Sequence, residues 1–244
     1  MAKIKISIVI CLVLLMYASI LIYGCATNTS TTPELNETYY PHTNGNRWVY
    51  SSTTQNNAQI RIGDITVPVS SEFTSSEEAI FDGTEELAGI GTSQLYKTWE
   101  NGTLTGSTRV IANASGVKYY GNEGDVSTAE TYTILVFPGG SWTASASPQT
   151  TATVIGKEPV TIGSTTYSDC YKVLYSYTSS EIFSYPPYNF SYNASVNSYV
   201  WFAKNVGAVK RMSTSTGSTT ATGYSSVTLS VSNTTTQTLT SKNF

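Results

Sequence analysis

Short turn signals recur along most of the chain, and they constrain its fold more than any other feature. The segments between them are rich in Tyr, Thr and Val, and the turn pairs are Asn44-Gly45, Asp82-Gly83, Asn101-Gly102 and Gly139-Gly140. Tyr, Thr and Val favour extended strands, and turn pairs of this kind join neighbouring antiparallel strands. The pattern predicts a mainly β protein, an antiparallel meander with few helices.

One order of motifs occurs twice. The matches are Tyr40-Pro41 and Trp48 with Phe137-Pro138 and Trp142, Tyr96-Lys97 with Tyr171-Lys172, and Gly116-Val117-Lys118 with Gly207 to Lys210. We interpret them as two related β units, about 40–120 and 137–211, followed by a C-terminal strand at about 224–232, all within a single domain, 39–244.

Two meanders in one domain predict a strongly curved sheet, either an open half-barrel or a sandwich. In this interpretation hairpins turn at Asp82-Gly83 and Gly156-Lys157. Trp48 and Trp142 are expected to occupy equivalent buried positions.

The N-terminus has the order of an export signal. Lys3 and Lys5 precede an uncharged, mostly apolar run over residues 6–23, which ends at Gly24-Cys25. This order is typical of a secretory signal peptide, and the run could alternatively remain as an uncleaved membrane anchor. Both alternatives place the rest of the chain outside the cytoplasm, at the cell surface or on the periplasmic face of a membrane. Residues 25–38 are polar and without pattern, as expected of a flexible tether.

Charge and cysteine content exclude several classes. Removing residues 1–24 leaves 11 basic and 16 acidic residues, a net charge of −5, which gives no basic surface for nucleic acid. Of the three cysteines, Cys11 lies in the signal and Cys25 at its end, so Cys170 has no partner for a disulfide. We interpret Cys170 as a buried, small apolar side chain.

The junction 21–25, Leu-Ile-Tyr-Gly-Cys, resembles the lipobox of prokaryotic lipoproteins, which implies cleavage before Cys25 and a lipid on that cysteine. Residues 40–50 and 201–210 are similar to the opening and closing motifs of a group of uncharacterised prokaryotic cell-envelope lipoproteins, whose motifs carry no activity. More remotely, a lipid-anchored antiparallel protein resembles the half-barrel carriers of the Lol type, and this resemblance implies an apolar ligand on the concave face.

The chain offers little chemistry for catalysis. His42 is its one imidazole, and no Gly-x-Ser-x-Gly motif accompanies it. Adjacent glutamates such as Glu77-Glu78 and Glu85-Glu86 would point to opposite faces of a strand. We therefore expect no enzyme activity, no metal site and no cofactor.

Aromatic residues concentrate between Tyr177 and Phe202, in a stretch that is longer in the second unit than in the first. Aromatic rings suit sugar faces, acyl chains or protein partners, and they also pair across strands within a core. We predict that four of them form a ligand-binding lip: Tyr185, Tyr188, Phe190 and Tyr192.

Seven Asn-x-Ser/Thr sequons are candidate glycosylation sites in a host that N-glycosylates exported proteins. They start at Asn28, Asn36, Asn101, Asn113, Asn189, Asn193 and Asn233.

These features predict a membrane-anchored, non-enzymatic protein that binds an apolar or amphipathic ligand in the cell envelope. The alternative is a surface structural or adhesion module without a ligand cavity. Its partners would be the membrane, through the lipid anchor, and a lipid, a glycan or an envelope protein.

Overall fold

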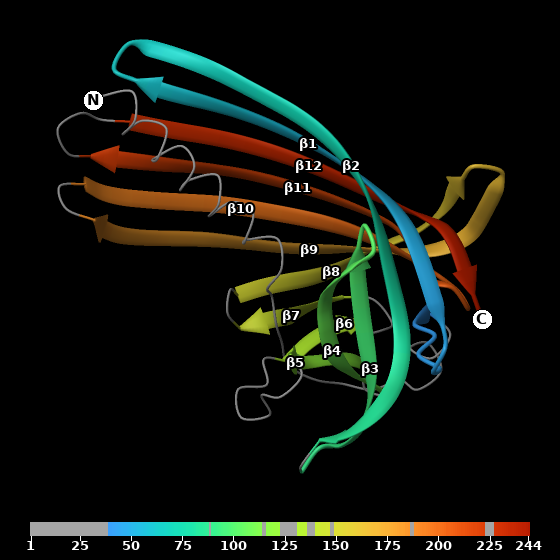
Figure 1. Ribbon diagram of the computed structural model, residues 1–244. Coiled ribbons are helices and arrows are strands. Elements are labelled where there is room, and N and C mark those ends of the chain that lie inside the picture. Colours follow the sequence, from blue (N-terminus) through green and yellow to red (C-terminus); the bar gives the residue numbers. More distant parts are fainter. Residues whose placement is uncertain are drawn as a thin grey trace.

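The computed structural model describes residues 39–87, 89–113, 116–122, 131–135, 140–146, 149–185, 188–222 and 227–244. These residues form one antiparallel sheet of twelve strands, and no helix appears among its elements. The prediction of a mainly β meander is therefore confirmed (Figure 1). In the part of the chain that is described, no helix is long and apolar enough to cross a membrane.

The strands divide into two runs of six. The first run comprises β1 (Arg47–Ile62), β2 (Ile65–Leu87), β3 (Gly91–Glu100), β4 (Thr103–Asn113), β5 (Gly116–Asn122) and β6 (Thr131–Leu135). The second run comprises β7 (Ser141–Ala146), β8 (Gln149–Ile162), β9 (Thr165–Tyr185), β10 (Tyr188–Ala203), β11 (Gly207–Thr222) and β12 (Val227–Asn243). Within each run consecutive strands pair as hairpins, and the seam between the runs is β1 against β12.

The sequence matches fall on equivalent strands of the two runs. Trp48 and Trp142 lie near the starts of β1 and β7, and the Tyr-Lys pairs lie on β3 and β9. Gly116 and Gly207 begin β5 and β11. The last strand, β12, is longer than expected because it follows β1 along its whole length.

The expected turns at Asp82-Gly83 and Gly156-Lys157 are wrong. Both sites lie inside long strands, β2 and β8, where the pairing with the next strand shifts register at a β-bulge. Gly83 and Gly156 have φ values of 99° and 150°, a region open to glycine, so each supplies the local kink without ending its strand.

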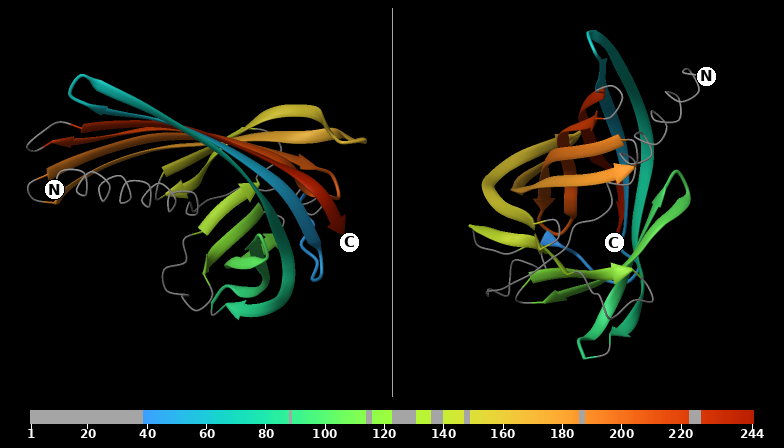
Figure 2. Two further views of the ribbon diagram at one scale, coloured as in Figure 1. Left: turned by 45° about the horizontal axis from the view of Figure 1, so that its top comes forward. Right: turned by 90° about the vertical axis from the view of Figure 1, so that its left-hand side faces the viewer.

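The two ends of the sheet, β6 and β7, meet so that the sheet is nearly closed into a barrel (Figure 2). Side chains of the second run bridge this closure to backbone carbonyls of β6. Trp142 Nε1 donates to the carbonyl of Thr133 at 2.9 Å, and the Tyr175 hydroxyl donates to the carbonyl of Ile134.

The core fills one end of the barrel. Residues 39–46 enter this end before β1, where Tyr39 packs edge-on against Tyr171 and Tyr40 packs edge-on against Phe81. Trp48 is 4% exposed, contacts Phe81, and donates from Nε1 to the carbonyl of Val206 at 2.6 Å. Trp142, its counterpart in the second run, is only half-buried.

We predict that Trp48→Ala lowers the free energy of unfolding by about 3–5 kcal/mol, because it removes a large buried ring and leaves a cavity. Trp142→Ala removes a half-buried ring and is expected to cost less. Chemical denaturation of both variants measures the difference. Equal losses would contradict the unequal burial of the two rings.

Candidate functional site: the inner face of the long strands

Six strands continue well beyond the barrel as an extended sheet, which we call the extension. It consists of residues 65–76 of β2, 51–62 of β1, 227–236 of β12, 213–222 of β11, 188–199 of β10 and 174–185 of β9. The β1–β2 turn and the outer ends of β9, β10, β11 and β12 lie together at its far end (Figure 1). Strand β2 has no second neighbour before Glu77, where its pairing with β3 begins, and β9 has none beyond Tyr177, where its pairing with β8 ends.

The register assigns every residue of the extension to one of two faces, because side chains alternate along each strand and residues directly opposite share a face. One face continues the barrel core, for Val200 and Val173 lie on it and both are buried. We call this the inner face and the opposite one the outer face.

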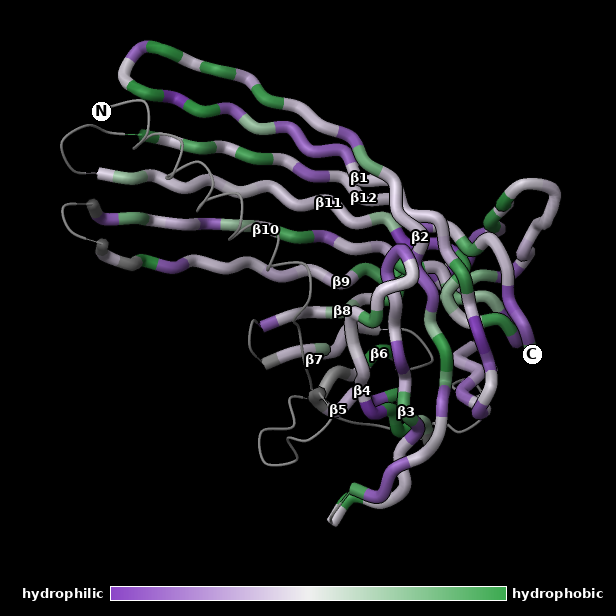
Figure 3. Tube along the Cα trace, in the orientation of Figure 1, coloured by the Kyte–Doolittle hydropathy of each residue, from purple (hydrophilic) through white to green (hydrophobic). Residues whose placement is uncertain are grey.

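About half of the described inner positions of the extension are apolar, and most of the others carry Ser, Thr or Asn. The apolar residues with described side chains are Ile65, Val67, Val69 and Phe73 on β2, Ala58, Ile60 and Ile62 on β1, Val227, Leu229 and Val231 on β12, Ala221 on β11, Phe190, Tyr192, Ala194 and Val196 on β10, and Tyr175 and Tyr177 on β9. Figure 3 shows the resulting alternation of apolar and polar positions along β1 and β2.

The outer face of the same strands is hydrophilic. On β1 it carries Thr53, Gln55, Asn57, Gln59 and Arg61, and on the neighbouring strands it carries mainly Ser, Thr and Asn. Ile182, which is 81% exposed, is an exception. The extension is therefore a sheet with one polar face and one face on which apolar residues predominate along β10 and toward the far ends of the strands.

Part of the apolar face is open to water. On the outer strand β2, Ile65 is 68% exposed, and Val67, Val69 and Phe73 are each close to half exposed. On the central strands the inner side chains are less exposed, and Tyr192 is 9% exposed. Exposed apolar residues gathered on one face of a sheet are typical of an interaction surface.

The predicted lip residues lie at the end of the β9–β10 hairpin. Tyr185 ends β9 and pairs with Tyr188, which begins β10. Phe190 and Tyr192 follow on the inner face, opposite Ala221 and Thr219 of β11. The aromatic stretch therefore lengthens two strands of the extension instead of forming a separate loop, and its role in binding stays a prediction.

Sequence reasoning missed the apolar positions of the β1–β2 hairpin. The period-two alternation was present in residues 58–62 and 65–69, on both sides of Gly63-Asp64. That signal indicates a hairpin with one apolar face.

Inside the barrel mouth, a layer of tyrosines borders the inner face of the extension. Tyr96 stacks on Tyr119 with ring centroids 5.7 Å apart, and the hydroxyls of Tyr40 and Tyr119 are hydrogen-bonded. The Tyr50 hydroxyl donates to the carbonyl of Ala208 at 3.0 Å. Burial raises the pKa of Tyr40, Tyr50, Tyr96 and Tyr119, so that their hydroxyls remain protonated at neutral pH.

The paired glutamates separate as expected. Glu77 lies on the inner side and accepts a hydrogen bond from Gln237 Nε2, whereas Glu78 pairs with Arg47 at 2.7 Å. Glu85 pairs with Arg109, while Glu86 accepts a hydrogen bond from Thr92. Neither pair has the two facing carboxylates that a glycosidase needs.

The two other residues considered for catalysis, His42 and Cys170, lie outside the inner face of the extension. His42 Nδ1 lies 3.2 Å from the carbonyl of Tyr40. Cys170 is fully buried and unpaired, and burial raises the pKa of its thiol to about 11, which keeps it protonated and unreactive at neutral pH. No group of three or more His, Cys, Asp or Glu suited to a metal occurs among the described residues.

Candidate sequons fall on both faces of the extension. Asn189 and Asn193 are exposed on the outer face, and Asn101 is exposed in the β3–β4 turn. Asn233 is half-buried on the inner face, where a glycan would cover the apolar surface. The structure does not describe the side chain of Asn113, and Asn28 and Asn36 lie outside the described residues.

One depression on the described surface is shallow and open. It is lined by Tyr50, Ser51, Thr74, Ser75, Ser76, Asn101 and Thr240. Tyr50 is the one member of the tyrosine layer that borders it. The inner face of the extension therefore remains the stronger candidate site.

Two solved bacterial structures are similar to this chain. A "putative lipoprotein" from Parabacteroides distasonis has a TM-score of 0.41 at 15% identity and covers 86% of this chain and 100% of its own. A "putative exported protein with YmcC-like fold" from Bacteroides fragilis has a TM-score of 0.32 at 12% identity and covers 85% of this chain and 99% of its own. No protein-family model matches the sequence, and no curated protein matches it significantly.

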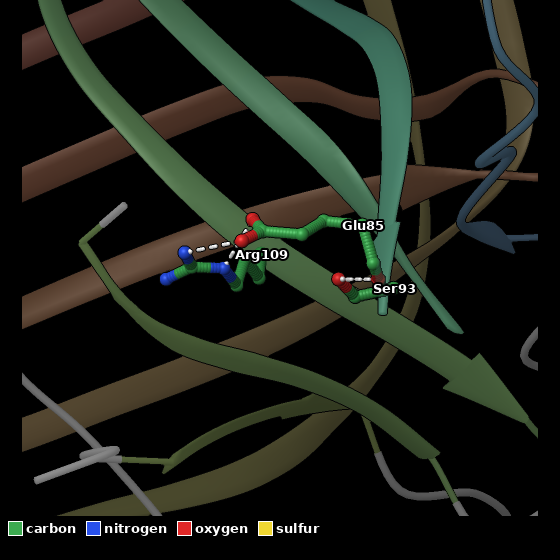
Figure 4. A network of polar contacts seen from close by, with 3 residues as sticks. All are labelled: Glu85, Ser93 and Arg109. Carbon is green, nitrogen blue, oxygen red and sulfur yellow. Dashed lines mark hydrogen bonds and ion pairs between the residues drawn. The ribbon is translucent and has the colours of Figure 1, made fainter. Parts of the chain in front are cut away.

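The ion pair that gives a testable pH dependence is Arg109 with Glu85 (Figure 4). Arg109 is 2% exposed and donates from Nε and Nη2 to the two carboxylate oxygens, at 2.6 and 2.9 Å. Ser93 hydrogen-bonds the carbonyl of Glu85 at 2.9 Å and holds the backbone there. The hydrogen bonds from Arg109 lower the pKa of Glu85 below its usual range.

A carboxyl group whose pKa is lowered by folding stabilises the protein above its unfolded pKa, and this contribution is lost as the pH falls through the folded value. We predict that Glu85→Gln lowers the melting temperature at pH 7, and that the difference from wild type shrinks below about pH 4. Melting curves between pH 7 and 3 measure this. Glu100→Gln, at the exposed end of β3, serves as the control, and a constant Glu85→Gln difference across the range would contradict the assignment.

Proposed function

We propose that this protein is an exported, membrane-anchored binding protein that holds an apolar or amphipathic ligand on the inner face of its extension. The observation that carries the proposal is the asymmetry of the extension, whose inner face carries nearly all of its apolar residues and whose outer face is Ser-, Thr- and Asn-rich. Six strands of about ten residues, at about 4.8 Å between strands and about 3.3 Å per residue, give a face of roughly 1,000 Å².

Burial of this face would supply a large binding free energy. Each methylene group that leaves water contributes about 0.8 kcal/mol, so an acyl or isoprenoid chain could bind tightly without many polar contacts. The open edges at β2 and β9 leave the face accessible from the side.

Binding without catalysis agrees with the chemistry of the described residues. Glu77 and Glu78 lie on opposite faces, and the Cys170 thiol is buried. We therefore propose that the protein is not an enzyme. The alternative of a structural or adhesion module would gain support if the inner face bound no ligand.

Attachment to the membrane rests on the sequence of the first 25 residues, which lie outside the described part of the chain. We propose that Cys25 carries the lipid and that residues 26–38 tether the domain to the membrane.

Two adjacent residues of β2 test the binding face. Val69 points to the inner face and Ser70 to the outer face, and both are exposed. We predict that Val69→Lys lowers the affinity for a fluorescent apolar probe such as N-phenyl-1-naphthylamine at least fivefold, whereas Ser70→Lys leaves it unchanged. Titration of residues 27–244, produced through export, measures both. Equal effects would argue against the inner face as the site.

The anchor is tested separately. We predict that wild-type protein incorporates an alkyne-labelled lipid precursor during growth, and that Cys25→Ala abolishes the label because it removes the only thiol at the junction. In-gel detection of the label measures this. Label retained on Cys25→Ala would contradict lipidation at this position.

A further inference from the structure

One charged side chain lies where the barrel interior meets the inner face of the extension. Arg211 of β11 is directly opposite Val200 of β10 and Gln237 of β12, so it points to the inner side of the sheet. Its side chain is exposed even though it faces the barrel, which means that the mouth is open to water at this level.

Polar groups of the barrel surround this guanidinium. Its charge interacts with the Glu77 carboxylate and with the hydroxyls of Tyr50, Tyr96 and Tyr119. Glu77 already accepts a hydrogen bond from Gln237. Within the described residues, no carboxylate oxygen lies within 4.0 Å of an Arg211 nitrogen, so no close ion pair occupies it.

Arg211 is also isolated from other cations. From its level to the hairpin ends, the inner positions of the described strands carry one other charged residue, Glu181, on the outer strand β9. The ten residue steps from Arg211 to Ala221 span about 33 Å at about 3.3 Å per residue. Polar residues occupy the inner positions next to Arg211 on β11 and β12 (Ser213, Ser215, Asn233 and Thr235), whereas apolar residues run along β10 from Val196 to Phe190. A single positive charge therefore stands at the barrel end of this apolar row.

Building on the proposed function, we infer that Arg211 binds the anionic head group of an amphiphile whose apolar chain lies along the inner face of the extension. A guanidinium presents a planar fork of N–H donors that matches the oxygens of a carboxylate or phosphate. The apolar chain of the ligand would lie on the apolar residues beyond Arg211. The head group at Arg211 and the chain on the extension together fix the orientation of the ligand.

Two matched photoreactive probes test this inference on the full chain, produced through export and held in phosphatidylcholine nanodiscs. One is a diazirine-bearing C16 fatty acid, and the other is the corresponding C16 alcohol, which lacks the negative charge. Mass spectrometry of the β1–β2 and β10–β12 peptides gives the labelling by each probe. The readout is the ratio of acid to alcohol labelling on these peptides.

In wild-type protein we expect the acid to label these peptides at least fivefold more than the alcohol. Arg211→Gln is expected to bring the ratio near one while alcohol labelling persists. Arg211→Lys, which keeps the charge without the planar fork, is expected to give an intermediate ratio. The control is Arg61→Gln. Arg61 lies on the outer face of the extension, so this substitution is expected to leave the ratio of acid to alcohol labelling unchanged.

The outcomes separate this inference from the function on which it rests. Equal labelling by acid and alcohol in wild type, or an unchanged ratio in Arg211→Gln, overturns the role of Arg211 and leaves ligand binding intact. Absence of label from the inner-face peptides with either probe overturns both.

Discussion

The period-two alternation of side chains along a strand is the constraint on which this structure depends. Along a strand that runs from the barrel into the extension, every second side chain points to the inner face of the sheet. Val200 in the barrel core and Tyr192 in the extension lie on one face of β10 for this reason. Where the strands continue beyond the barrel, no core covers their inner face, and its apolar residues form a surface. The same alternation leaves Ser, Thr and Asn on the outer face.

The polar outer face presents hydrogen-bonding side chains to water along the whole extension. Trp201 shows how a large ring is accommodated on that side. It is 5% exposed because Lys172 and Lys210, on the two neighbouring strands, lie within 5.0 Å of its ring, and Nε1 donates to Glu158 at 2.6 Å. Both ammonium groups lie over the indole as cation–π contacts, and Lys172 Nζ also pairs with Glu158 at 3.1 Å.

Fold class could be predicted from the sequence, because turn pairs and strand-forming residues act locally. The bulges at Gly83 and Gly156 could not, since a glycine within a strand and a glycine at a hairpin turn differ only in whether the next strand continues the pairing. The candidate site was predicted in part. Aromatic residues drew attention to β10, whereas Arg211 gives no local signal, because its place at the barrel mouth depends on pairing with a strand about 25 residues away.

The seam between β1 and β12 joins the first strand of the sheet to the last, so their pairing has the longest sequence separation in the fold. Each run of six strands can form hairpins as it emerges, but β1 lacks its second neighbour until the final 18 residues of the chain have been delivered. Contacts of such separation form slowly, and an unpaired strand with an apolar face is prone to aggregate. The β1–β2 hairpin therefore keeps an unpaired edge until β12 has been synthesised, and it must be protected from other partners until then.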